Sequence, residues 1–197
     1  MNIRHFAVVL LLAATAGAAQ ASSLALVPSA DTVAQNGAFT VNLVLDAADA
    51  PGAHPGLYGG EIVVNFDRTL LTYGNFALAG GLSFFSAPVV ATNGNNQTVT
   101  FGFDNAPDTG TVGTFSFTAT GTPGSIATLG LIDADDFSGS FASYVPTYQR
   151  FYPTFTGTQV TISAVPLPAG IWLLGTAVGA LAARRRFRPA AAGRAAA

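Results

Sequence analysis

The sequence contains no cysteine and no lysine, and its 197 residues include only two histidines and one glutamate. The absence of cysteine excludes disulfide bonds, thiol catalysis and cysteine-ligated zinc. Residues 22–164 contain ten carboxylates against Arg68 and Arg150, which gives this part of the chain a formal charge of −8. Nucleic acid requires basic contacts to its phosphates, so this composition argues against a nucleic-acid partner. Cations and neutral sugars are compatible with it.

Residues that enzymes commonly use are also scarce. His54 lies in the Pro- and Gly-rich segment 51–56, which is typical of a loop, and the sequence has no G-x-S-x-G nucleophile motif. Glu61 alternates with the apolar Ile62 and is expected to point outward, with no second carboxyl evident to complete a glycosidase pair. We therefore expect a non-catalytic protein, and a hydrolase is kept only as a third hypothesis.

The first 21 residues have the pattern of a signal peptide. Arg4 supplies the positive charge, residues 6–14 form a short apolar core, and Ala19-Gln20-Ala21 matches an A-x-A cleavage site. The apolar core is too short for a membrane-spanning helix. We predict export and a mature chain that begins at Ser22.

The C-terminal region combines three features in a fixed order. Residues 165–169 read Val165-Pro166-Leu167-Pro168-Ala169, residues 170–183 are predominantly apolar, and an arginine cluster occupies 184–188. The arginines of the cluster are Arg184, Arg185, Arg186 and Arg188. Clustered arginine at the end of a membrane helix stays on the cytoplasmic side, so we predict one transmembrane helix with residues 22–164 outside the cytoplasm. Residues 189–197 form a short tail beyond the cluster.

This combination resembles the PEP-CTERM sorting signal of Gram-negative bacteria, in its VPLPA-CTERM variant. The resemblance covers about residues 165–188 and implies recognition by a membrane-embedded exosortase with cleavage near the motif. It further implies a protein held in the inner membrane with its ectodomain in the periplasm, then delivered to the cell surface or to the exopolysaccharide matrix of a biofilm. The alternative is an ordinary C-terminal anchor that is never cleaved.

The middle of the chain alternates apolar and polar residues with a period of two, which is typical of β-strands with one buried face. In 98–103, for example, Val99, Phe101 and Phe103 are expected to point inward and Thr98 and Thr100 outward. Turn-forming clusters rich in Gly, Pro, Asn and Asp separate the segments. The predicted strands are 24–27, 39–46, 61–66, 70–76, 82–90, 98–103, 114–119, 126–132 and 158–162. About nine such strands predict an all-β fold, an antiparallel β-sandwich spanning residues 22–164 as one domain.

The strand pattern also resembles the cohesin-like fold, which several carbohydrate-binding modules share. The similarity is found in four segments, one of which is the strand that ends in Asn65-Phe66-Asp67. These segments are 35–41, 60–67, 115–117 and 157–162. It implies a binding module rather than an enzyme.

One segment of the ectodomain is unusually aromatic. Residues 141–155 read FASYVPTYQRFYPTF, and they include Tyr144, Tyr148, Arg150 and Tyr152. Tyrosines on a proline-stiffened loop can stack on sugar rings or anchor a protein partner, so these four residues are the candidate ligand-binding site. The alternative is that the aromatic residues cap the open end of the sandwich.

Two acidic loops are candidates for calcium, which prefers several oxygen ligands. One contains Asp133, Asp135 and Asp136, and the other contains Asp104, Asn105 and Asp108. Neither matches the EF-hand spacing, and the alternative is that they are solvated turn carboxylates, so no metal or other cofactor is assigned.

The main functional hypothesis is an exported, non-catalytic surface or matrix protein whose ectodomain binds carbohydrate. The alternative is a cohesin-like adaptor that binds another protein.

Overall fold

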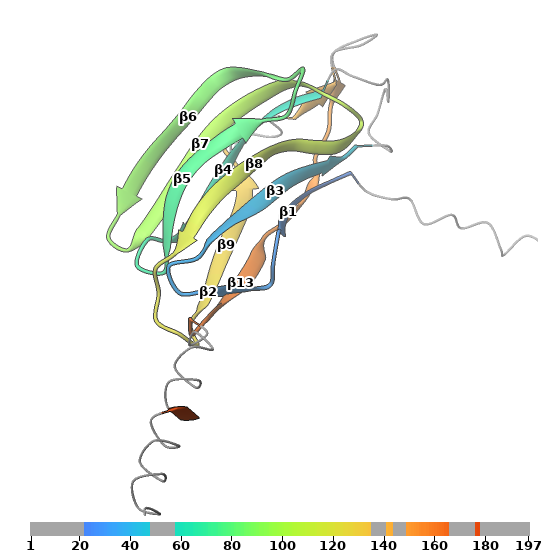
Figure 1. Cartoon of the computed structure of the whole chain (residues 1–197). Helices are drawn as coiled ribbons and strands as arrows, with labels where there is room; N and C mark the ends of the chain where they lie inside the picture. The colour runs from blue at the N-terminus through green and yellow to red at the C-terminus, as the bar shows by residue number, and fades with distance from the viewer. Residues whose placement is uncertain (1–21, 48–57, 135–140, 144–148, 166–175, 178–197) are drawn as a thin grey trace, which may run out of the picture. The chain divides into compact units, whose positions relative to one another are not determined.

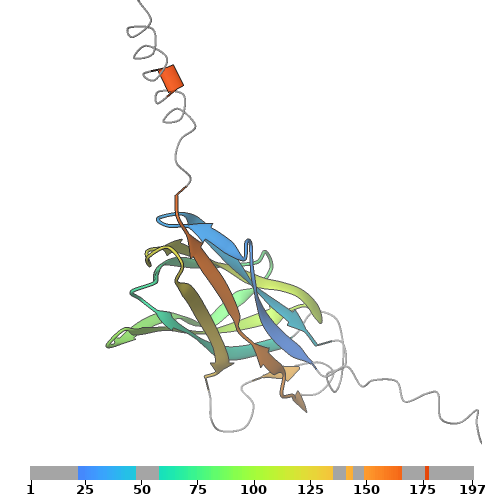
Figure 2. The same ribbon diagram turned by 90° about the horizontal axis from the view of Figure 1, so that it is seen from below.

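A computed structural model of the chain describes residues 22–47, 58–134, 141–143, 149–165 and 176–177. The chain divides into two compact units, Met1–Ala164 and Val165–Ala197. The first unit contains all the described strands, and they form two sheets packed face to face (Figures 1 and 2). The all-β sandwich that the alternation predicted is therefore confirmed.

The first sheet has five strands, and its longest members are neighbours in the middle of it. Their order is β12 (Thr154–Thr156), β1 (Ser23–Pro28), β3 (Ala38–Asp46), β8 (Thr109–Ala119) and β5 (Leu71–Leu78). Phe39 on β3 is opposite Phe117 on β8, and Phe76 on β5 is opposite Phe115. The inward face of this sheet is consequently lined with aromatic rings.

The second sheet has eight strands, and β4 is at its centre. Its main order is β6 (Ser83–Asn93), β7 (Asn96–Ala106), β4 (Tyr58–Asp67), β9 (Ile126–Asp133), β13 (Thr158–Ser163) and β2 (Thr32–Ala34). The short strands β10 (Ala142–Ser143) and β11 (Gln149–Arg150) extend the sheet beside the first residues of β4. Strands β6 and β7 form a hairpin whose two-residue turn is Gly94-Asn95, and the φ of 59° at Gly94 favours glycine there.

The two sheets enclose one aromatic-rich core. Phe66 of β4 meets Phe117 of β8 edge to face at 5.1 Å between ring centroids, and Phe101 of β7 meets Phe115 of β8 at 5.8 Å. Phe76 packs against both Phe101 and Phe115, at 4.2 and 4.4 Å. The Phe66–Phe117, Phe101–Phe115 and Phe76–Phe101 contacts join strands from opposite sheets, so the core itself fixes how the sheets face each other.

All nine predicted strands are present, but the prediction was incomplete in two respects. Strands β2, β10, β11 and β12 were missed, and the sandwich is not entirely antiparallel. β12 pairs with β1 in parallel, and β13 pairs with β2 in parallel. Both parallel pairs arise because the chain crosses from one sheet to the other at the start and at the end of the domain. β1 leads into β2 at the first crossing, and β12 leads into β13 at the second. At the second crossing Gly157 approaches the carbonyl of Leu129 so closely that a Cβ has no room.

Candidate binding face

The outward face of β9, β4, β7 and β6 has one row of four residues, of which three are apolar and the two outermost are exposed. Ile132 is opposite Val63, Val63 is opposite Thr100, and Thr100 is opposite Val89. Neighbouring strands lie about 5 Å apart, so this row crosses four strands. The side chains of Val89 and Ile132 are 61% and 55% exposed. We call Ile132, Val63, Val89 and the adjacent Phe85 the apolar row.

Phe85 is held in place although its side chain is 55% exposed. Its ring lies against Gly102 of β7, on the outward face, so closely that a Cβ on Gly102 would collide with it. Gly102 is opposite Glu61 on β4, which is the next outward-facing pair after Val63 and Thr100. An aromatic ring that rests on a glycine surface is a pre-positioned contact, because little side-chain freedom is left to lose on binding.

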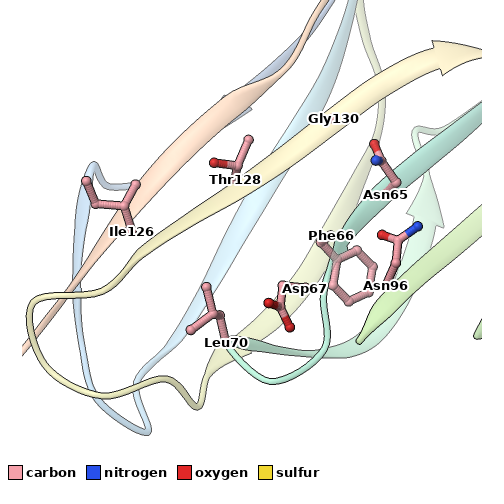
Figure 3. A pocket seen from close by; sticks show the side chains of 8 residues that line it. All are labelled: Asn65, Phe66, Asp67, Leu70, Asn96, Ile126, Thr128 and Gly130. Carbon is pink, nitrogen blue, oxygen red and sulfur yellow. The ribbon is translucent and has the colours of Figure 1, made fainter. Parts of the chain in front are cut away.

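A shallow pocket of about 360 Å³ lies on the same face, toward the end where β4 finishes (Figure 3). Strand β4 contributes Asn65 and Asp67 to its outward lining, β7 contributes Asn96, and β9 contributes Thr128 and Gly130. The remaining lining residues are Phe66, Leu70 and Ile126. The pairing explains why these groups meet: Asn65 is opposite Gly130, and Asp67 is opposite Asn96.

The polar side chains that line the pocket differ in whether they make hydrogen bonds. Asp67 Oδ1 accepts hydrogen bonds from the backbone N–H of Thr69 at 2.8 Å and from Thr69 Oγ1 at 2.7 Å. These two hydrogen bonds lower the pKa of Asp67, so its carboxylate is charged at neutral pH. Within the described part of the chain, no hydrogen bond is made by the side chains of Asn65, Asn96 or Thr128.

Comparison with solved structures identifies the architecture. The chain superposes on the seventh ScaB type I cohesin of Pseudobacteroides cellulosolvens with a TM-score of 0.55 and 16% identity, covering 74% of this chain and 96% of that one. The fold is that of a cohesin module. A type I cohesin of Clostridium thermocellum, solved as the OlpA cohesin–dockerin complex, gives a TM-score of 0.52 at 12% identity over 71% and 99% of the two chains. A type II cohesin domain from the cellulosome of Acetivibrio cellulolyticus gives 0.50 at 12% identity over 72% and 95%.

The sequence comparisons add no family. No protein-family model matches the chain, and no curated protein does. The cohesin-like character of residues 22–164 is thus shown at the level of the fold.

The structure divides the aromatic segment 141–155 between core and surface. Phe141 and Phe151 are buried and pack edge to face, with their ring centroids 5.7 Å apart. The ring of Phe151 also contacts that of Tyr58, at 5.5 Å between centroids. Tyr152 is 65% exposed, and Arg150 on β11 is exposed as well. Tyr144 and Tyr148 lie outside the described residues. The four predicted ligand-binding residues therefore cannot be placed as one site, although Tyr152 presents its ring to solvent.

In the acidic loop 104–108, carboxylate oxygens accept hydrogen bonds from the backbone N–H groups of the next residue. Asp104 Oδ1 accepts a hydrogen bond from the N–H of Asn105 at 2.9 Å, and Asp108 Oδ1 accepts one from Thr109 at 3.0 Å. Asn105 Nδ2 donates to Ser83 Oγ at 3.0 Å. In the described ranges no three His, Asp or Glu side chains gather where they could hold a metal ion. Asp133 ends β9, and Asp135 and Asp136 lie outside those ranges.

The remaining predicted sites fall mostly beyond the described residues. This group comprises the sorting-motif residues Pro166, Leu167, Pro168 and Ala169 and the arginine cluster Arg184, Arg185, Arg186 and Arg188. His54, expected in a loop and given no catalytic role, also lies outside the described residues. Val165 is described and exposed. A search of the described residues for a helix of membrane-spanning length and hydrophobicity found none.

Sequence reasoning missed both the apolar row and the pocket. Strand 82–90 was predicted, but alternation is irregular there, and the register shifts at Ser86 on both sides hide which residues point outward. The available signals were Gly102 and Gly130, since glycine inside a strand often marks a place where another group approaches the backbone closely. At Gly130 that group is the side chain of Asn65.

Proposed function

We propose that this protein is an exported, non-catalytic adaptor module that binds a protein partner through the outward face of β9, β4, β7 and β6. The observation that supports this most directly is the apolar row, where Phe85, Val89 and Ile132 are each more than half exposed on one face. Exposed apolar side chains gathered on one surface mark sites of protein interaction. An exposed aromatic ring that rests on the sheet at such a site is suited to act as an interface anchor.

The cohesin fold supports the same function. The Clostridium thermocellum cohesin that this chain resembles was solved in complex with a dockerin, which is a statement about that protein. For the present chain the likeness favours the adaptor hypothesis over the carbohydrate hypothesis. It also favours a binding module over an enzyme, in keeping with the scarcity of catalytic residues.

The charges near the apolar row indicate what kind of partner fits. Glu61 lies on the same outward face of β4 as Val63, two residues from it, and residues 22–164 have a formal charge of −8. Complementary potentials favour association and suppress wrong partners. We therefore propose a folded partner whose contact surface is apolar at its centre and carries lysine or arginine at its rim.

Export and anchoring are part of the proposal and rest on the terminal sequence patterns. The signal peptide 1–21 would direct the ectodomain across the inner membrane, and the VPLPA-type signal would retain it there for an exosortase-type enzyme. The mature ectodomain would then act at the cell surface or in the extracellular matrix.

Affinity capture from the native host's envelope and medium, with paired variants of β6, tests the docking face. Val89 and Val90 are adjacent and both exposed, but Val89 is opposite the outward-facing Thr100, whereas Val90 is opposite the buried Val99. Phe85→Ala and Val89→Ser should each abolish recovery of a stoichiometric protein partner, and Val90→Ser should not. Undiminished recovery with Phe85→Ala and Val89→Ser would show that the partner binds elsewhere.

Carbohydrate binding is the second candidate function, and the observation that favours it is the 65% exposed ring of Tyr152. An exposed tyrosine can stack on a sugar ring while its hydroxyl remains hydrated. Glycan-array binding that is lost in Tyr152→Ala would support this function. Array binding that is unchanged in that variant would remove Tyr152 from consideration.

A further inference from the structure

We propose that the pocket between the ends of β4, β7 and β9 is a binding site for one neutral sugar residue, distinct from both the apolar row and Tyr152. The proposal goes beyond the adaptor function and does not depend on it. Its basis is that Asn65, Asp67, Asn96 and Thr128 line one depression (Figure 3).

The pocket has the size and the mixture of groups expected for a small ligand. Its volume of about 360 Å³ is at the lower end of the range of roughly 300–1,000 Å³ for small-molecule sites. The aliphatic side chains of Leu70 and Ile126 form apolar wall, and Ile126 is 56% exposed. Gly130 has no side chain, and the Asn65 amide lies over its backbone in the space that a Cβ would occupy. Such walls suit the C–H surface of a sugar ring.

The polar groups match hydroxyls better than they match other ligands. A hydroxyl both donates and accepts; the Asp67 carboxylate only accepts, whereas the Asn65 and Asn96 amides do both. Neighbouring hydroxyls of a sugar can therefore donate to Asp67 and accept from an amide at the same time. Asp67 Oδ1 is already engaged by Thr69, which fixes the carboxylate and leaves Oδ2 as its second acceptor.

The same groups argue against the main alternatives. No lysine or arginine lines the pocket, and Asp67 is charged, so an anionic ligand would meet repulsion. A calcium ion requires about six to eight oxygen ligands, usually with several carboxylates, and this pocket offers only one carboxylate beside two aliphatic walls. A neutral, polyhydroxylated ring is the ligand that can contact both the polar side chains and the aliphatic side chains of the pocket.

The strand pairing provides a matched pair of variants for the test. Asn93 and Asn96 are directly opposite each other in the β6–β7 hairpin, and both are exposed, but only Asn96 lines the pocket. Asn96→Ala should remove a contact to the ligand. Asn93→Ala should remove a chemically identical side chain that does not contact the ligand. Gly130→Ala is an independent perturbation, because the added Cβ collides with Asn65 Oδ1 and displaces that amide.

The experiment is saturation-transfer NMR on the full-length protein with free glucose, galactose, mannose and N-acetylglucosamine as probes, and with glucuronate and calcium chloride as comparison ligands. We expect at least one neutral sugar to bind with a Kd on the order of 1 mM, the scale for a ligand of this size in a shallow site. Asn96→Ala and Gly130→Ala should weaken that binding by at least about tenfold, and Asn93→Ala and Tyr152→Ala should leave it unchanged. Glucuronate should bind more weakly than glucose.

Several results would overturn the proposal. These are binding that survives Asn96→Ala, binding that is lost in Tyr152→Ala alone, calcium binding without sugar binding, or no neutral sugar that saturates the site. Should Gly130→Ala fail to fold, the Asn96 and Asn93 variants still decide the question. Because Phe85 and Val89 do not line the pocket, loss of sugar binding and loss of partner binding are separately measurable.

Discussion

Replacement of Phe101 by alanine is the sharpest test of how the sandwich is held together. The Phe101 side chain is fully buried, and its ring meets Phe76 at 4.2 Å and Phe115 at 5.8 Å across the interior. It also contacts Phe84 and Phe103 on its own sheet, at 6.1 and 6.5 Å. Removal of the ring would leave a hole bounded by side chains from both sheets, and backbone pairing prevents those strands from collapsing into it.

The expected cost follows from two contributions. The lost transfer free energy of a buried phenyl ring is about 2–3 kcal/mol, and the unfilled cavity adds to it. Together they destabilise the fold by about 3–5 kcal/mol. In a domain of about 140 residues this corresponds to a fall in Tm of roughly 10–15 °C. Guanidinium denaturation of Ser22–Ala164 expressed alone, followed by far-UV circular dichroism, measures the free energy directly.

Thr100→Ala is the matched control, because Thr100 precedes Phe101 on β7 and points to the outward face. Its replacement should change the free energy of unfolding by no more than about 0.5–1 kcal/mol. Equal losses from the two substitutions would show that the inward and outward faces of β7 have been misassigned, and the core as described would then be wrong.

The sequence predicted the long strands because their burial has a physical period of two. In β7 the fully buried Val99, Phe101 and Phe103 alternate with Thr98 and Thr100, as the pattern requires. β3 follows the same rule from Phe39 to Leu45. Val44 is apolar at a position where the alternation requires a polar residue, and it lies at the register shift between Leu43 and Val44. Local patterning determined these elements because each has one face against the core.

The short strands could not be predicted, since two or three residues cannot show a period. β2 exists because Val33 is opposite Ile162 of the last strand, and β12 exists because Phe155 is opposite Leu24 of the first. These pairings join residues from the two ends of the ectodomain. Only the tertiary fold brings them together, and this is also why the parallel direction of both pairs was missed.

The candidate binding face was unpredictable for a related reason. Asn65, Asp67, Asn96 and Thr128 belong to three strands and form no sequence motif, so strand register alone makes them neighbours. The aromatic segment drew attention in the sequence, yet Phe141 and Phe151 are used in the core. An unusual local composition therefore indicated packing at those two positions, whereas ordinary strand residues formed the surface that carries the polar pocket and the exposed apolar side chains.

Two further predictions concern ionisation and processing. Burial raises the pKa of Tyr73 above its ordinary value of 10.0, so the unfolded chain ionises first as the pH rises. Stability should be constant below that value and fall above it, and Tyr73→Phe should lose less stability than wild type in denaturation between about pH 9 and about pH 11. An identical decline in both proteins would exclude Tyr73 as the cause. For processing, intact mass of the protein from its native host should show cleavage after Ala21 and loss of the segment containing Trp172. Pro166 and Pro168 cannot join a following helix interior and keep the motif extended for an enzyme, so their joint replacement by alanine should leave the protein membrane-bound and uncleaved. A mature wild-type protein that retains Trp172 would mean that the C-terminal segment is a permanent anchor, and the sorting hypothesis would be wrong while the adaptor hypothesis stood.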